Sequence, residues 1–206
     1  MTFSRLYSVV GGYFRRRRRL WLLSEFADCR TVVDMGGTPK SWDGIRFPSI
    51  TLVNVTQNDG QLPSGLQFVQ ADACHSSLTA SFDLAYSNSA IEHLGNWERQ
   101  REFAEEMLRL GRRVYCQTPN RWFPVEPHFL ALFVHWLPLG CFSHFAHRYL
   151  TLQGLAQKPS AAKSKQIRQA ESIRLLTKRE LRDLFPGCHI RVERFLGWPK
   201  SFAAWR

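Results

Sequence analysis

The stretch VVDMGGTPKSW, residues 32–42, joins an apolar run to an acid, two adjacent glycines and a Thr-Pro pair. A β-branched run that ends in Gly36 and Gly37 is typical of a buried strand entering a tight loop, because glycine adopts positive φ at low cost and lets a ligand approach the backbone. The dinucleotide-binding fingerprint G-x-G-x-x-G is absent, since Thr38 and Lys40 stand where further glycines are needed. The stretch therefore predicts the first strand-to-helix turn of a nucleotide-binding α/β sheet.

The chain that follows this turn alternates between strand and helix patterns. Strand-like runs cover residues 31–35, 50–55, 66–70, 82–87 and 113–118. Between the last two runs, Asn96 is a suitable N-cap for a helix that ends at Gly111. Strands separated by helix-length or loop-length connections predict a mainly parallel sheet with helices on both faces.

The rest of the chain completes this architecture. We expect a leading basic helix over residues 1–28, and a lid insertion with a basic loop over residues 119–176, which are aromatic and punctuated by prolines. The pattern Thr177-Lys-Arg-Glu180 is a capping box, and residues 189–198 and 201–205 supply two last strands. We therefore predict one α/β domain over all 206 residues: a Rossmann-like seven-stranded, mainly parallel sheet with an aromatic lid insertion after strand five.

The chain is strongly basic, with a formal net charge of +11. Its basic residues concentrate in Arg15–Arg19 and in residues 158–182. Such clusters favour an anionic partner, which can be nucleic acid, a lipid surface or an acidic substrate, although a solvated surface is the commoner role of a charge run. Nucleic acid is less favoured, because the sequence contains no ordered aromatic platform for base stacking.

The cysteines and the apolar runs indicate the cellular compartment of the protein. The five cysteines are widely spaced without a C-x-x-C pair, which argues against a zinc site or a disulfide framework and favours a reducing compartment. The four apolar residues after Arg19 are too few for a signal peptide, and the apolar window from Phe129 is interrupted by His135 and Pro138. We expect a cytoplasmic protein without a transmembrane segment, with a peripheral position at a membrane as the alternative. Its oligomeric state stays open.

Polar residues follow four of the predicted strands at the point where each strand ends. They are Asp34 to Gly37, Asn54, Asp72 and the pair Ser87-Asn88. Ligands of open α/β sheets bind outside the carboxyl ends of the parallel strands. These residues are therefore expected to converge on one small molecule.

In this order the motifs resemble those of the class I S-adenosylmethionine-dependent methyltransferases, in particular their small type 11 branch. The similarity covers residues 30–130 and, less closely, residues 175–206. The resemblance implies S-adenosyl-L-methionine as cofactor, with a glycine loop under its methionine part, a ribose contact after the second strand and an adenine contact after the third. The residues that it assigns to cofactor binding are Asp34, Gly36, Gly37, Asn54, Asp72, Ala73, Ser87 and Asn88.

Two departures from the family's pattern concern this cofactor site. The glycine loop lacks a later glycine, and Asn54 stands where the family usually has an acidic residue. A neutral amide typically contributes less than a charged acceptor to a hydrogen bond. If Asn54 faces the ribose, the substitution Asn54→Asp is expected to tighten cofactor binding.

The sequence indicates the binding site of the methyl acceptor less clearly than that of the cofactor. Methyl transfer from a sulfonium is an in-line displacement, so it needs donor and acceptor in contact but no metal and no covalent nucleophile. A base serves only an acceptor that must lose a proton, and histidine is the most suitable side chain for this. His93 after the fourth strand, with Glu126 and His128 near the lid, are the candidate catalytic residues. The aromatic lid and basic N-terminus suit a small-molecule or lipid-like acceptor and an anionic membrane surface.

The sequence leaves other interpretations open. A non-catalytic binding module is suggested by the reduced glycine loop and Asn54, and a basic RNA-binding protein by the two basic segments. For His93 the alternative is a histidine that packs at the start of a helix. For Glu126 it is a structural ion pair, for example with Arg121.

Overall fold

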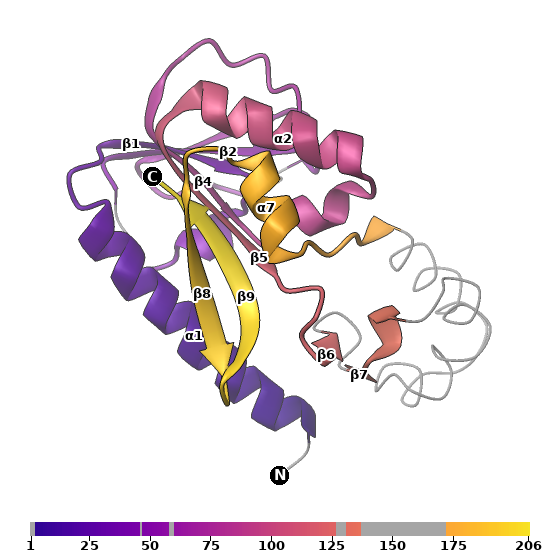
Figure 1. The fold of residues 1–206 in the computed structure, drawn as a ribbon. Coiled ribbons are helices and arrows are strands. Elements are labelled where there is room, and N and C mark those ends of the chain that lie inside the picture. Colours follow the sequence, from indigo (N-terminus) through magenta and orange to yellow (C-terminus); the bar gives the residue numbers. More distant parts are fainter. Residues whose placement is uncertain (1–2, 46, 58–59, 127–130, 137–171) are drawn as a thin grey trace, which may run out of the picture. The chain divides into compact units, whose positions relative to one another are not determined.

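The computed structural model describes residues 3–45, 47–57, 60–126, 131–136 and 172–206 (Figure 1). The chain divides into two compact units. The first combines Met1–Ala27 with Arg121–Ile173, and the second combines Asp28–Asn120 with Arg174–Arg206. The second unit holds the sheet on which the candidate site is built, and the expectation of a single domain stays a prediction.

A seven-stranded sheet forms the centre of the second unit. Its strands are β1 (Thr31–Met35), β2 (Ser49–Asn54), β3 (Leu66–Gln70), β4 (Phe82–Asn88), β5 (Gly111–Pro119), β8 (His189–Phe195) and β9 (Trp198–Trp205). Their order is β3-β2-β1-β4-β5-β9-β8; the strands from β1 to β5 pair in parallel, and β9 runs antiparallel to β5 and β8. The predicted Rossmann-like, mainly parallel sheet of seven strands is therefore confirmed (Figure 1).

Two helices of the second unit pack on the same face of this sheet. α2 (Trp97–Leu110) starts at the predicted cap Asn96, whose side chain accepts a hydrogen bond from the N–H of Arg99 at 2.9 Å. α7 (Lys178–Leu184) starts at Thr177 with the predicted capping box. Both helices share one hydrophobic cluster with alternate residues of the strands, which include Val33, Met35, Val53, Ala85, Val114 and Cys116. Because side chains alternate along a strand, Asp34 lies on the opposite face.

The connection between β1 and β2 is more compact than the predicted strand-to-helix turn. After β1 the chain forms only η1 (Pro39–Trp42), a short 3-10 helix. Gly44 follows with a φ of 70°, and Pro48 precedes β2. A longer α-helix would place these residues in its interior, where glycine and proline are unfavourable. A second 3-10 turn, η2 (Ile91–Leu94), lies between β4 and α2.

The main element of the first unit is α1 (Phe3–Glu25), which occupies most of the predicted leading helix. Arg15, Arg16 and Arg17 are exposed on it, whereas Phe14 and Leu22 are buried. Within the predicted lid, β6 (Val125–Glu126) pairs with β7 (Ala131–Leu132), and η3 (Val134–Trp136) follows. The remainder of the predicted lid and basic loop lies largely outside the described residues. No helix in the described part of the chain combines the length and apolar character needed to cross a membrane.

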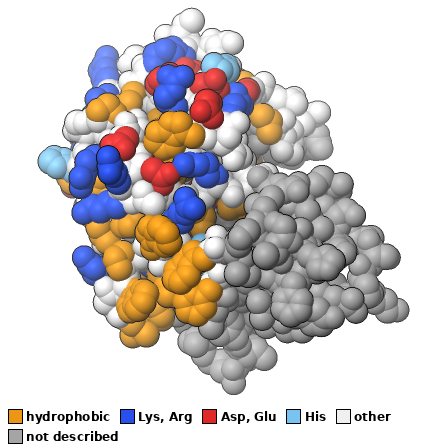
Figure 2. Space-filling model, turned by 45° about the vertical axis from the view of Figure 1, so that its right-hand side comes forward, with side chains coloured by type: hydrophobic (Ala, Val, Ile, Leu, Met, Phe, Trp, Pro, Cys, Tyr) orange, Lys and Arg blue, Asp and Glu red, His pale blue; other side chains and the backbone are white. Residues whose placement is uncertain are grey.

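Charged side chains of both signs are interspersed on the face shown in Figure 2. In the second unit, two arginines of α2 form ion pairs, Arg99 with Asp72 and Arg101 with Glu105. Their opposite charges offset each other locally. The positive surplus of the chain is instead most evident in the arginine run of α1.

Candidate functional site

The glycine loop after β1 packs tightly against other parts of the chain. Gly36 has a φ of 85°, which favours glycine, and its N–H donates to the carbonyl of Val53 at 2.8 Å. A Cβ placed on Gly36 would lie 2.6 Å from the Cβ of Ala90, just beyond β4. A Cβ placed on Gly37 would overlap the carboxyl group of Asp34. The packing of the loop therefore requires both predicted glycines before any ligand is considered.

Asp34 lies against this loop and is buried, with 2% of its surface exposed. The indole Nε1 of Trp42 donates a hydrogen bond to its Oδ2 at 2.7 Å. Burial raises the pKa of Asp34 from 3.8 to about 7, and the hydrogen bond from Trp42 opposes this rise. The carboxyl group therefore supports the loop from within the protein, and its direct contact with a cofactor stays a prediction.

Asn54, at the end of β2, braces the same loop. Its Nδ2 donates to the carbonyl of Gly36 at 3.2 Å and to that of Gly37 at 3.1 Å. Its Oδ1 accepts a hydrogen bond from the N–H of Thr56 at 3.0 Å. The amide thus donates hydrogen bonds through Nδ2 and accepts one through Oδ1. A carboxylate could not reproduce both, because it accepts hydrogen bonds but does not donate them.

This geometry reverses the expected effect of Asn54→Asp. The new carboxylate oxygen would face the carbonyls of Gly36 and Gly37 without a hydrogen to donate, so the loop would lose two hydrogen bonds and gain repulsion. We expect the free energy of unfolding in urea to fall by about 2 kcal/mol, and the affinity for S-adenosylhomocysteine to fall with it. Gln57→Glu makes the same charge change at an exposed position nearby. If Asn54→Asp and Gln57→Glu changed the free energy of unfolding and the affinity equally, Asn54 would not brace the glycine loop.

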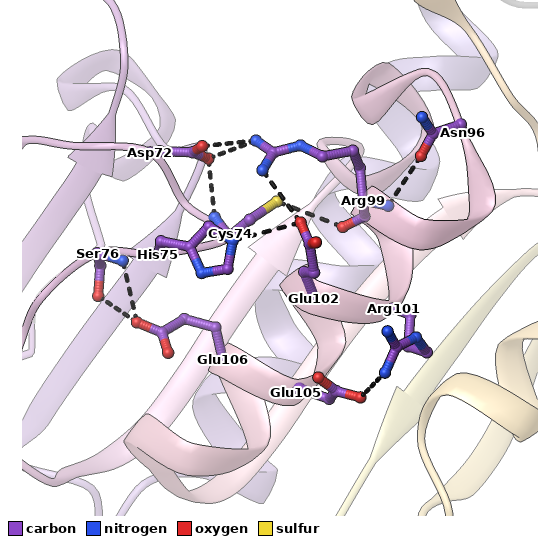
Figure 3. A network of polar contacts seen from close by, with 10 residues as sticks. All are labelled: Asp72, Cys74, His75, Ser76, Asn96, Arg99, Arg101, Glu102, Glu105 and Glu106. Atoms are coloured by element: carbon purple, nitrogen blue, oxygen red, sulfur yellow. Dashed lines mark hydrogen bonds and ion pairs between the residues drawn. The ribbon is translucent and has the colours of Figure 1, made fainter.

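Asp72, just beyond β3, is held by α2 and by its own loop (Figure 3). Nη2 of Arg99 donates to both carboxylate oxygens, at 2.8 Å to Oδ1 and 2.6 Å to Oδ2, and the N–H of Cys74 donates to Oδ1 at 3.0 Å. Burial acts to raise the pKa of Asp72, but these donors outweigh it and the pKa is lowered. Its side chain remains 39% exposed, so a ligand can reach the carboxylate. Ala73 beside it packs against the hydrophobic cluster.

The end of β4 joins this edge through three consecutive polar residues. Ser87 is fully buried, and its Oγ donates to the carbonyl of Met35 at 3.0 Å, which ties β4 to the end of β1. Asn88 is exposed and lies opposite Gln117 of β5. Ser89 has a φ of 57°, and its N–H donates to the carbonyl of Gln117 at 2.9 Å. Positive φ at a residue other than glycine costs free energy and is common at functional sites, but no pattern in the sequence marks Ser89.

The predicted catalytic residues fall in different units of the chain or outside the described residues. His93 lies in η2 with an exposed side chain, and its N–H donates to the carbonyl of Ala90 at 2.9 Å. Glu126 belongs to β6 in the first unit, and His128 lies outside the described residues. The catalytic roles of these three residues stay predictions.

A buried acid next to His93 was not anticipated from the sequence. Glu92 is 0% exposed and accepts a hydrogen bond from Oγ1 of Thr118 at 3.1 Å. Its carbonyl accepts from the N–H of Arg174 at 2.8 Å, so it joins η2 to β5 and to the segment before α7. The available signal was an acid directly after the apolar Ile91, since buried acids need partners.

Thiol chemistry contributes little to this edge of the sheet. Burial raises the pKa of Cys74 to about 12 and that of Cys116 well above its ordinary value. A thiol that stays protonated is a poor nucleophile.

Across the described ranges, no group of three or more His, Cys, Asp or Glu side chains is arranged to hold a metal ion. The candidate site is thus the glycine loop with Asn54, Asp72 and the end of β4.

Comparisons with known proteins agree with this architecture. The family model described as "Methyltransferase domain" matches residues 47–113, a segment that includes Asn54, Asp72 and Ser87. No curated protein sequence matches the chain.

Solved structures that resemble the chain include three methyltransferases. The N-methyltransferase NodS from Bradyrhizobium japonicum WM9 has a TM-score of 0.55 and 10% identity, over 93% of this chain and 94% of that chain. Magnesium protoporphyrin IX methyltransferase from Synechocystis PCC 6803, with bound S-adenosylhomocysteine, has a TM-score of 0.57 and 10% identity, over 100% and 88%. The 1,6-didemethyltoxoflavin-N1-methyltransferase of Burkholderia thailandensis has a TM-score of 0.56 and 14% identity, over 93% and 76%. At such identities the likeness shows the fold alone. The chain therefore has the fold of the class I methyltransferases, and the resemblance seen in its motifs is confirmed.

Proposed function

We propose that the protein is an S-adenosylmethionine-dependent methyltransferase that acts on a small-molecule or lipid-like acceptor. The observation that carries this proposal is the meeting of four polar strand ends, in the family's order, at the carboxyl edge of a sheet with the methyltransferase fold. The similar structures support it, because one of them contains bound S-adenosylhomocysteine and another contains S-adenosylhomocysteine together with 1,6-didemethyltoxoflavin.

The polar groups of this edge fit the cofactor's chemistry. Adenosine offers an amino group and two ribose hydroxyls as donors, and the edge offers the accessible carboxylate of Asp72 and the half-buried amide of Asn54 as acceptors. The left-handed turn at Gly36 leaves the loop without a side chain where the methionine part would lie. Asp72 would hold the adenine and the Gly36–Gly37 loop the methionine part, while Asn54 keeps that loop in place.

Methyl transfer requires little covalent catalysis by the protein. When bound, the cofactor supplies an electrophilic methyl group on a sulfonium. The chain's own residues hold donor and acceptor in line and exclude water between them. His93, exposed in η2, is the residue we propose to accept a proton from an acceptor that must lose one.

The acceptor class and location are proposed from the first unit. Arg15, Arg16 and Arg17 of α1 are exposed together with Tyr13 and Leu20, which are 57% and 58% exposed. Arginines near an anionic bilayer contribute about 1 kcal/mol each. This arrangement supports peripheral docking on an anionic membrane surface, where the protein would receive a lipid-like acceptor. The cytoplasmic location is proposed from the widely spaced cysteines.

A non-catalytic module with the same fold is the second candidate. The observation that favours it is the engagement of Asn54 with the glycine loop, which leaves its amide hydrogens committed within the chain. Such a module would bind the cofactor weakly or not at all and transfer no methyl group.

Calorimetric titration with S-adenosylmethionine and S-adenosylhomocysteine tests the proposed function. We expect saturable binding of both ligands. Incubation with radiolabelled S-adenosylmethionine and the soluble or lipid fraction of a cell extract then tests turnover, and label in the lipid fraction is expected. Label only in the soluble fraction would favour a water-soluble acceptor. No binding at millimolar ligand would reject the cofactor assignment, and binding without label in either fraction would favour the second candidate.

A further inference from the structure

Arg99 connects the end of β3 to α2 through a network of ion pairs (Figure 3). One terminal nitrogen, Nη2, contacts both oxygens of Asp72, and the other, Nη1, donates to Oε2 of Glu102 at 3.1 Å. The Oε2 atom of Glu102 also lies 3.4 Å from Nε2 of His75. The guanidinium therefore has two carboxylate anchors, one at the candidate site and one on its own helix.

The backbone of Arg99 is fixed as firmly as its side chain. Its N–H donates to the side chain of the helix cap Asn96 at 2.9 Å, and its carbonyl accepts from Sγ of Cys74 at 3.3 Å. Cys74 in turn donates its own N–H to Asp72. Residues on the loop after β3 and on the first turn of α2 thus hold each other in register, and Arg99 stands at their junction.

This arrangement leaves Asp72 oriented but still open to a ligand. Its Oδ1 accepts from Arg99 and from the N–H of Cys74, whereas its Oδ2 accepts from Arg99. A carboxylate oxygen accepts up to about two hydrogen bonds, and 39% of the side chain is exposed. Because the pairing also lowers the pKa of Asp72, the group stays ionised at neutral pH and acts only as an acceptor.

We propose that Arg99 is a positioning residue for the cofactor, which aims the Asp72 carboxylate so that it selects an adenine base by its 6-amino group. This inference rests on the proposed function, since it assigns Arg99 to the same cofactor site. An amino group is a donor that an oriented carboxylate accepts, whereas a base with hydrogen at that position offers no donor to the open acceptor site on the carboxylate. Sites built around such a hydrogen bond discriminate strongly against ligands that lack it.

The ion pair of Arg99 differs from a neighbouring ion pair on α2 in its exposure and in the distance along the chain between its partners. Arg101 pairs with Glu105 one turn along α2, and both side chains are more than half exposed, at 56% and 60%. Arg99 and Asp72 are 34% and 39% exposed and lie 27 residues apart in the chain. Arg101 therefore offers a matched control, with the same residue type and helix but no link to the site.

The test measures the dissociation constants of S-adenosylhomocysteine and of its analogue with hydrogen in place of the 6-amino group. The full chain is used as wild type and with Arg99→Gln, Arg99→Lys, Arg101→Gln, Asp72→Asn and the double change Arg99→Gln with Asp72→Asn. Circular dichroism and thermal melting establish that each variant is folded. If Arg99→Gln does not fold, Arg99→Lys, which retains a charge but presents one donor group, carries the comparison.

We expect the wild type to prefer S-adenosylhomocysteine over the analogue by about tenfold or more, the range of a hydrogen bond to a charged group. Arg99→Gln should weaken S-adenosylhomocysteine binding about tenfold and change analogue binding little, so that the preference largely disappears. Arg99→Lys should retain part of the preference, and Arg101→Gln all of it. In the Asp72→Asn background, Arg99→Gln should have less than about a twofold further effect.

Equal weakening of both ligands by Arg99→Gln would overturn the inference, because a merely structural role lowers both affinities alike. A wild type that binds S-adenosylhomocysteine without preferring it would overturn this inference and leave the proposed function intact. A wild type that binds neither ligand would overturn both.

Discussion

The stability of the protein should fall by roughly 2.5 kcal/mol between pH 5 and pH 8 through Asp34 alone. In the folded state, burial raises the pKa of this carboxyl group from 3.8 to about 7. The folded protein therefore binds a proton more tightly than the unfolded chain, and the contribution to stability is full below pH 3.8 and lost as the pH rises through about 7. Urea unfolding at several pH values from 5 to 8 measures this loss.

The variant Asp34→Asn isolates the effect. Asparagine keeps an oxygen that can accept from Nε1 of Trp42 but carries no titrating proton, so the fall between pH 5 and pH 8 should disappear. Asp43→Asn, at an exposed position in the same connection, serves as the control and should keep the wild-type slope. The carboxylates whose pKa is lowered, such as Asp72 and Glu106, lose their contribution only at more acidic pH and do not interfere in this window. Parallel pH curves for the wild type and Asp34→Asn would contradict the assignment.

Gly36→Ala should reduce the free energy of unfolding by about 3 kcal/mol and weaken S-adenosylhomocysteine binding. Two costs add here. An L-residue at a φ of 85° is unfavourable by about 1 kcal/mol or more, and a Cβ at 2.6 Å from the Cβ of Ala90 forces the loop and the end of β4 apart. Since the Cβ of Ala90 is attached rigidly to its backbone, it cannot rotate out of the way.

Two further variants separate these costs. Gly95 has the same φ of 85°, with a ψ of −48°, and a Cβ placed on it would meet no heavy atom within 4 Å, so Gly95→Ala measures the cost of a Cβ at this φ without a steric contact. Ala90→Gly combined with Gly36→Ala removes the contact and should recover the remaining part of the loss. Urea unfolding of the three variants gives the comparison. If Gly36→Ala costs no more than Gly95→Ala, the close packing of the glycine loop on Ala90 is wrong.

Much of the fold could be predicted because its signals are local. The strands at 31–35 and 66–70 have the predicted bounds, and the caps at Asn96 and Thr177 start the helices that were expected. A cap satisfies free N–H groups within one helical turn, so its pattern can be read from neighbouring residues. The difference after β1 arose where Gly44 and Pro48 limit the helix to a short 3-10 turn.

The sequence predicted which residues lie at the candidate site better than it predicted what each of them contacts. Asn54 was expected to meet a ribose, and it is found bonded to the glycine loop. Glu92 was overlooked, because the apolar Ile91 before it was the only local signal and its burial beside Thr118 comes from tertiary packing. The roles of His93, Glu126 and His128 stay predictions.

The sequence by itself determined the order and type of the elements and the set of polar residues at the strand ends, since periodicity, caps and turns depend on near neighbours. Only the tertiary structure decided what those polar residues contact. The partners of Asn54 and Asp72 lie up to 18 and 27 residues away along the chain, and the contact exists only because the parallel strands bring their carboxyl ends to one edge. The raised pKa of Asp34 has the same origin, because burial is a property of the packed sheet and not of the residue's neighbours in the chain.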